Sequence, residues 1–198
     1  MSRSLPETAV REVLEGCSEP CFTVTESLQI QYCNAAWDRF ALANNGAEAV
    51  RERVIARNLL DFIPSDLKTF YAALLGGTRR TDEPLSHNYE CSSNSVFRLY
   101  RMLIYPLERG FAVINSLRIA HPHDRTPVDV NVPRYINREG LIRMCANCRR
   151  TKRVNEPGAW DWVPDFVEHR RPNVTHGVCP PCLEYYYRLP IHKWQKVS

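Results

Sequence analysis

Two cysteine pairs near the C-terminus form the most specific chemical pattern in this chain of 198 residues. Cys145 and Cys148 make the first C-x2-C pair, and Cys179 and Cys182 make the second. A gap of two residues lets both thiolates of a pair bind the same ion, and two pairs supply the tetrahedral four-sulfur shell of a structural zinc site. Because four thiolates leave no open coordination position, we expect Zn2+ to hold the fold here and to do no catalysis.

Two alternatives concern the same region. His176 lies three residues before the second pair and could replace one sulfur. Since four cysteines already suffice, we expect His176 instead to donate a hydrogen bond to one of the metal-binding cysteines. The cysteines could also form a redox dithiol or two disulfides. A chain without a secretion signal is expected to keep its thiols reduced, which favours metal over disulfides.

Basic residues follow the first pair directly, at Arg149, Arg150, Lys152 and Arg153. Such a run could contact the phosphates of nucleic acid. However, a zinc ion bound by four thiolates has a formal charge of about −2, and nearby cations can offset it. We therefore favour charge compensation or a solvated face over a nucleic-acid interface.

The segment between the two pairs contains apolar residues at spacings compatible with a helix: Trp160, Trp162, Val163, Phe166 and Val167. They predict a small helical module with its own core. A module of about 60 residues with so few apolar anchors is marginal without help, so we expect the metal to stabilise it.

The rest of the chain must position this module. Its composition, 44% hydrophobic and 24% charged, is typical of a folded globular protein. The first residues lack the continuous apolar run of a secretion signal, and no stretch is long and apolar enough to cross a membrane. These features predict a cytoplasmic protein that does not bind a membrane.

The pattern of apolar residues before the module predicts a mixed order of elements. A short helix, a β-hairpin, a helix-rich stretch and three further strands are expected at residues 6–14, 21–34, 35–77, 85–93, 96–107 and 110–119. Asn34 is suited to cap the helix after the hairpin. Gly76 and Gly77 are predicted to end the last helix.

This order resembles that of a PAS domain, and so do three stretches of sequence. Residues 30–41 (IQYCNAAWDRFA) resemble the second strand and following helix of that family, and residues 58–64 (NLLDFIP) resemble its turn into the later helices. Residues 89–113 resemble its last three strands. The resemblance covers about residues 17–120 and implies an α+β fold with a PAS-like antiparallel sheet and flanking helices.

The C-terminal part also resembles a cysteine-containing tail, C-x2-C…W…SHG-x-CP-x-C, which follows sensor or receiver domains in bacterial signalling proteins. Thr175 stands where Ser is usual. We therefore place an N-terminal helix at 1–16, the PAS-like sensor domain at 17–120, a proline-rich linker at 121–133 and the zinc module at 134–198.

Together these features predict a non-enzymatic signalling protein. The chain has no G-x-S-x-G, phosphate-binding loop, H-E-x-x-H or kinase motif. We expect the PAS-like domain to sense a ligand or partner and the zinc module to bind a protein, and the resemblance implies a homodimer through the PAS domain. The alternatives are a zinc-dependent DNA-binding transcriptional regulator and a thiol redox sensor.

The sequence does not identify a ligand for the PAS core. Haem is disfavoured because residues 66–77, the helix that carries a histidine in haem-binding members, contain none. A covalent flavin is disfavoured because Cys33 precedes Asn34 instead of following an asparagine, as the flavin-binding motif requires.

Overall fold

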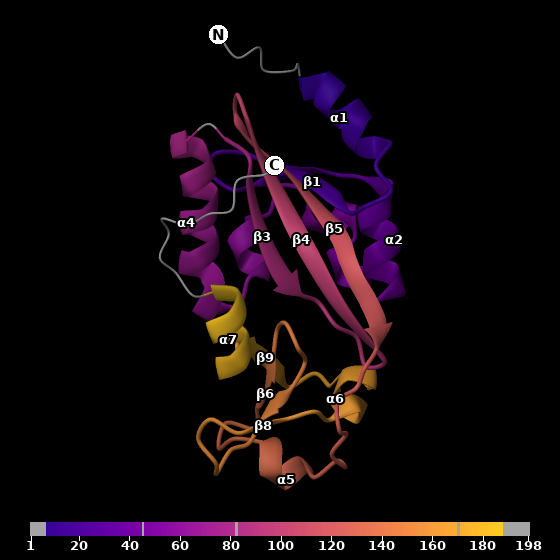
Figure 1. Cartoon of the computed structure of the whole chain (residues 1–198), viewed down its shortest axis with the longest axis vertical. Coiled ribbons are helices and arrows are strands. Elements are labelled where there is room, and N and C mark those ends of the chain that lie inside the picture. The colour runs from indigo at the N-terminus through magenta and orange to yellow at the C-terminus, as the bar shows by residue number, and fades with distance from the viewer. Residues whose placement is uncertain (1–6, 45, 82, 170, 188–198) are drawn as a thin grey trace.

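A five-stranded antiparallel sheet forms the larger part of the structure (Figure 1). The computed structural model describes residues 7–44, 46–81, 83–169 and 171–187, so the predicted domain ends at 1–6 and 188–198 lie outside the described residues. The strand order is β2-β1-β5-β4-β3. The bounds are β1 Cys21–Val24, β2 Ile30–Cys33, β3 Leu85–Glu90, β4 Val96–Leu107 and β5 Gly110–Pro122. This order and the flanking helices confirm the predicted PAS-like α+β fold.

Helices cover both faces of this sheet. Their bounds are α1 Glu7–Glu15, α2 Ala35–Ala43, η1 Ala47–Ala49, α3 Arg51–Val54, η2 Leu59–Phe62 and α4 Ser65–Thr81. Side chains of α4 pack with Phe111 and Val113 of β5, whereas Val10 and Leu14 of α1 pack with the intervening Ala112. Because neighbouring residues of a strand point to opposite faces, α1 and α4 lie on opposite sides of the sheet.

Asn34 connects the first three elements. Its Oδ1 accepts hydrogen bonds from the backbone N–H of Trp37 at the start of α2 and from that of Cys21 at the start of β1, each at 3.0 Å. Its Nδ2 donates to the carbonyl oxygens of Leu14, Cys17 and Glu19, at 2.9 to 3.2 Å. The predicted helix cap is therefore confirmed, and the same side chain also fixes the end of α1.

The predicted stop at Gly76 and Gly77 is wrong, because α4 continues to Thr81. Leu74, Leu75 and Thr78 are all buried on this part of the helix. A glycine inside a helix costs about 1 kcal/mol relative to alanine. Burial of the neighbouring side chains outweighs that cost, so packing decides where the helix ends.

A second sheet lies beyond one end of the long strands β4 and β5 (Figure 1). Its order is β8-β7-β6-β9, with β6 and β9 parallel and the other pairs antiparallel. The elements are α5 Val132–Tyr135, β6 Ile142–Cys145, β7 Thr151–Lys152, β8 Trp160–Asp161, α6 Pro164–Glu168, β9 Val174–Gly177 and α7 Pro180–Tyr187. The module thus has short helices, as expected, and also a sheet that the sequence analysis did not predict.

The apolar residues between the cysteine pairs divide over several of these elements. Val163 and Phe166 pack with Tyr135, Ile142 and Met144 in a core of the module's own.

No helix among the described residues is long and apolar enough to span a membrane.

Candidate metal centre

The parallel pairing of β6 and β9 brings the two cysteine pairs together. Cys145 is the last residue of β6 and pairs with Gly177, the last residue of β9. Each cysteine pair therefore lies at, or just after, the C-terminal end of one of two neighbouring strands. Cys148 lies in the turn after β6, and Cys182 is the third residue of α7.

The four sulfurs form one buried cluster. The Sγ atoms of Cys145, Cys148, Cys179 and Cys182 all lie within 4.8 Å of one another. The separation between the Cys148 and Cys179 sulfurs is 3.5 Å. A tetrahedral ion with bonds of about 2.3 Å requires sulfurs about 3.8 Å apart. The cluster therefore fits a tetrahedral metal ion in both donor type and size.

Backbone hydrogen bonds fix the conformation of the turn after β6, which carries the first cysteine pair. The N–H of Cys145 donates to the carbonyl of Arg150 at 2.8 Å, and the N–H of Arg149 donates to the carbonyl of Cys145 at 3.1 Å. Arg149 adopts a left-handed backbone conformation with φ of 61°. The N–H of Cys179 points at the Cys145 sulfur, 3.4 Å away. A donor aimed at sulfur stabilises the thiolate form.

The four thiols do not titrate alike. Hydrogen bonds with Cys148, Cys179 and Cys182 hold the pKa of Cys145 far below its usual value. Hydrogen bonds with the other three cysteines raise the pKa of Cys182. The four sulfurs interact strongly and titrate as a coupled group, and a metal ion would displace the protons that they retain.

His176 lies on β9 opposite Met144, and its side chain is exposed. It is not part of the four-sulfur cluster. A hydrogen bond from His176 to one of the metal-binding cysteines stays a prediction.

Arginines of the basic run after the first cysteine pair interact with other groups of the same chain. Burial disfavours the charge of Arg150, but the nearby sulfurs of Cys148, Cys179 and Cys182 outweigh that effect and raise its pKa. Arg153 donates from Nε and Nη2 to the carboxylate of Asp161, at 2.7 and 2.8 Å. These contacts favour charge compensation and internal pairing over phosphate binding.

A buried ion pair connects the linker to the large sheet, and the same arginine also contacts the module. Arg125 donates from Nη2 to Glu90 Oε1 and from Nη1 to the carbonyl oxygen of Cys148, at 2.5 and 2.6 Å. The same carboxylate oxygen accepts a hydrogen bond from Ser92 Oγ at 2.5 Å. The guanidinium also lies 5.2 Å from the ring centroid of Trp162. The Arg125 and Glu90 side chains are only 9% and 5% exposed.

Helix α7 makes the second connection, in the core of the PAS-like domain. The ring of Tyr187 packs against Phe70, Tyr71 and His87, with centroid distances of 4.9, 6.4 and 5.3 Å. Its hydroxyl accepts a hydrogen bond from Asn147 Nδ2 at 3.0 Å. Burial lowers the pKa of His87 to about 4. His87 is therefore a neutral member of this aromatic cluster near pH 7.

Sequence reasoning identified the cysteines but neither connection. Glu90 and Arg125 are 35 residues apart, and Tyr187 follows Phe70, Tyr71 and His87 by 100 residues or more. No local pattern marks either connection.

No family model matches the chain, and neither does any curated protein. Among solved structures, a PAS domain from a two-component sensor histidine kinase is 17% identical, with a TM-score of 0.34, and the match covers 59% of this chain and 95% of that one. The PAS domain from Bordetella pertussis BvgS is 13% identical, with a TM-score of 0.35 and coverages of 56% and 82%. At such values the likeness adds nothing to the strand order and helix positions, which define the PAS-like fold by themselves.

Proposed function

We propose that the protein is a non-enzymatic signalling protein of the cytoplasm. Its PAS-like domain would sense a ligand or partner, and a zinc module, residues 134–198, would bind another macromolecule. The observation that carries the proposal is the connection of the four-cysteine module with the PAS-like core. The contact is direct through Tyr187 and indirect through Arg125 of the linker, which binds both Glu90 and the Cys148 carbonyl. A sensor needs such a contact if a change in one part is to alter the other.

The donor set supports zinc as the metal. Soft thiolates in a tetrahedral arrangement are typical ligands of zinc and of iron–sulfur clusters, and a closed set of four is structural. Zinc bound here would supply no chemistry beyond fixing the turn after β6 to the start of α7. Arg150 would offset part of the negative charge of the thiolates.

Strand β3 is the element through which a signal would pass. His87 contacts Tyr187 of α7, and Glu90, the last residue of the same strand, binds Arg125. A small shift of β3 would therefore reach the linker before the module and the last helix of the module together. The result would be a change in the surface that the module presents to a protein partner. The PAS resemblance also suggests a homodimer.

The first test is elemental analysis of protein purified without added metal. We expect about one zinc per chain. Chelation should then unfold the module while the five-stranded sheet keeps its circular dichroism, and added zinc should restore the module. A metal-free chain whose module is folded would contradict the zinc proposal. Protein partners captured by the zinc-loaded chain and lost after chelation would support the signalling role.

The clustering of the thiols favours one second candidate, a thiol redox sensor. The Cys148 and Cys179 sulfurs are 3.5 Å apart across the two pairs. Oxidation by a peroxide would join two sulfurs, release the metal and remove two thiols from the free thiol count. Retention of metal and all four thiols under mild peroxide would exclude this candidate.

A further inference from the structure

His123 of the linker lies against the β3–β4 turn, residues 91–95. Its backbone N–H donates to the carbonyl oxygen of Ser95 at 3.1 Å. Its ring nitrogen Nε2 lies 2.8 Å from the carbonyl oxygen of Ser93. The same ring packs on Trp162 of the module, with a centroid distance of 4.5 Å. His123 therefore touches the large sheet and the module at once, and we call this contact the His123 joint.

The hydrogen bond to Ser93 fixes where the ring carries its proton. A carbonyl oxygen only accepts, so Nε2 must be the protonated nitrogen of the neutral ring. Nδ1 is buried and has no hydrogen-bond partner among the described residues. A second proton would have to bind at Nδ1, and a buried charged N–H without an acceptor is unfavourable. The joint therefore fits the neutral ring and not the imidazolium.

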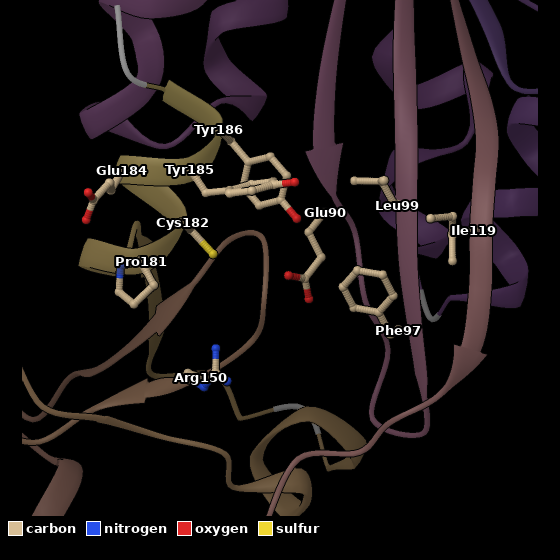
Figure 2. Close-up of a pocket in the computed structure, with 10 residues that line it drawn as sticks. All are labelled: Glu90, Phe97, Leu99, Ile119, Arg150, Pro181, Cys182, Glu184, Tyr185 and Tyr186. Atoms are coloured by element: carbon tan, nitrogen blue, oxygen red, sulfur yellow. The ribbon is translucent and has the colours of Figure 1, made fainter.

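Glu90 of β3 is the buried carboxylate beside the joint, and Figure 2 shows it directed toward the module. It favours a charged ring. However, Arg125 Nη2 and Ser92 Oγ already donate to its Oε1, each at 2.5 Å. The Arg125 guanidinium also packs over Trp162, the indole that His123 contacts, and it repels a second cation there.

Two further charged groups lie near the joint, Asp124 of the linker and Arg149 of the module. Asp124 favours a charged ring but is exposed, so solvent screens it. Arg149 donates from Nε to the Ser92 carbonyl at 3.3 Å and adds a cation on the module side. Burial of the ring outweighs the attraction of the two carboxylates and of the Ser93 carbonyl, so the pKa of His123 is lowered.

We propose that the His123 joint is a pH-sensitive latch, which holds the linker to the β3–β4 turn and to Trp162 while the ring is neutral and releases it when the ring binds a proton. Once released, the ring is exposed and has a pKa of about 6.5. The released state therefore binds the proton at a higher pH than the closed state does, and acid favours release. The latch is closed above about pH 6.5 and opens progressively below it.

Release would act on the connection between the sheet and the module. Arg125 follows His123 by two residues and binds both Glu90 and the Cys148 carbonyl. A linker freed at His123 would hold this arginine less firmly. The inference rests on the proposed function in this respect alone, since it gives the proposed route of the signal a second input, pH.

Hydrogen exchange followed by mass spectrometry tests the latch in the full chain loaded with zinc. Peptides that cover residues 91–96 and 121–128 are compared at each pH with the same peptides of the unfolded chain, which removes the intrinsic pH dependence of exchange. Each pH unit below about 6.5 favours the released state about tenfold, so protection should fall up to about tenfold between about pH 7.5 and pH 5.5. Peptides of β1 and β2 should keep their protection. Equal protection of the two joint peptides at both pH values would overturn the latch.

A matched pair of variants assigns the effect to one ring. In His123→Gln the amide can donate to the Ser93 carbonyl but cannot bind a proton, so the joint should stay closed at both pH values. His121 is exposed and stacks on Phe97, and His121→Gln should show the same fall as the unaltered chain. A fall that persists in His123→Gln, or one that disappears from both variants, would overturn the inference.

Nuclear magnetic resonance of the ring nitrogens gives a second test that needs no stable variant. At about pH 6 we expect His123 of the folded chain to be neutral and protonated at Nε2, and the same ring of the unfolded chain to be largely charged. A folded-state ring that is charged at this pH, or one with its proton on Nδ1, would contradict the latch.

Metal content measured at each pH separates this inference from the proposed function. A chain without metal contradicts the zinc module, and the latch is still judged by the difference between the two variants. A zinc-loaded chain in which the variants do not differ contradicts only the latch.

Discussion

Removal of Arg125 should destabilise the protein more than any ordinary surface substitution. Arg125→Met would leave the Glu90 carboxylate 5% exposed with Ser92 as its remaining side-chain donor, and would take a donor from the Cys148 carbonyl. Loss of one partner of a buried ion pair costs about 3–5 kcal/mol, because the other charge stays buried without compensation. We therefore expect the free energy of unfolding to fall by about 3 kcal/mol or more.

The double variant distinguishes this cause from lost packing. Glu90→Met added to Arg125→Met removes the stranded carboxylate, and buried ion pairs replaced by apolar residues often cost little. The double variant should thus be more stable than Arg125→Met alone, with a coupling energy of about 2 kcal/mol. Urea unfolding followed by circular dichroism and tryptophan fluorescence measures all four proteins of the cycle.

An exposed ion pair within the C-terminal module serves as the control. Arg134 and Glu156 are 3.4 Å apart, and their side chains are 36% and 52% exposed. Arg134→Met should cost less than about 1 kcal/mol. Costs for Arg125→Met and Arg134→Met that are equal, or a double variant whose cost is the sum of its two single variants, would refute the argument that Arg125 compensates a buried charge.

Two further predictions concern His87 and the basic run. The pKa of His87 is lowered to about 4 in the folded chain, against about 6.5 when exposed. The unfolded chain binds this proton at a higher pH than the folded chain does. The free energy of unfolding should therefore fall by up to about 3 kcal/mol as the pH drops from about 6.5 to about 4. In parallel acid titrations with excess zinc, His87→Phe should lack this contribution to the pH dependence of the free energy of unfolding. Arg150→Gln should weaken zinc retention against a chelator roughly tenfold, and Lys152→Gln should not. If instead both variants lost DNA binding equally and in a salt-dependent manner, the DNA-binding alternative would be favoured.

Local sequence signals predicted the parts of the fold that depend on neighbouring residues. The hairpin, the Asn34 cap and the three later strands follow from alternation and capping over a few residues, and the structure has each of them. The cysteine pairs could be recognised for the same reason, because two-residue spacing is itself the property that lets a pair bind one ion.

The features that the sequence left unpredicted depend on contacts between distant segments. Strands β7 and β8 have two residues each, which is too short for an alternating pattern. The parallel pairing of β6 with β9, which assembles the cluster, joins segments that are separated in sequence by β7, β8 and α6. The sequence could not identify the partners of Arg149 and Arg153, which donate hydrogen bonds to the Ser92 carbonyl and the Asp161 carboxylate.

The position of Tyr187 has a consequence for the order in which the protein can be made. During synthesis from the N-terminus, Phe70, Tyr71 and His87 leave the ribosome about a hundred residues before the ring that covers them, which corresponds to roughly 5–20 s at common elongation rates. Once β5 is complete at Pro122, and until α7 follows, the PAS-like domain has all its strands but an open aromatic face. Its last folding step must then wait for α7, and a fragment that ends at the linker should expose this face and associate with itself or with chaperones.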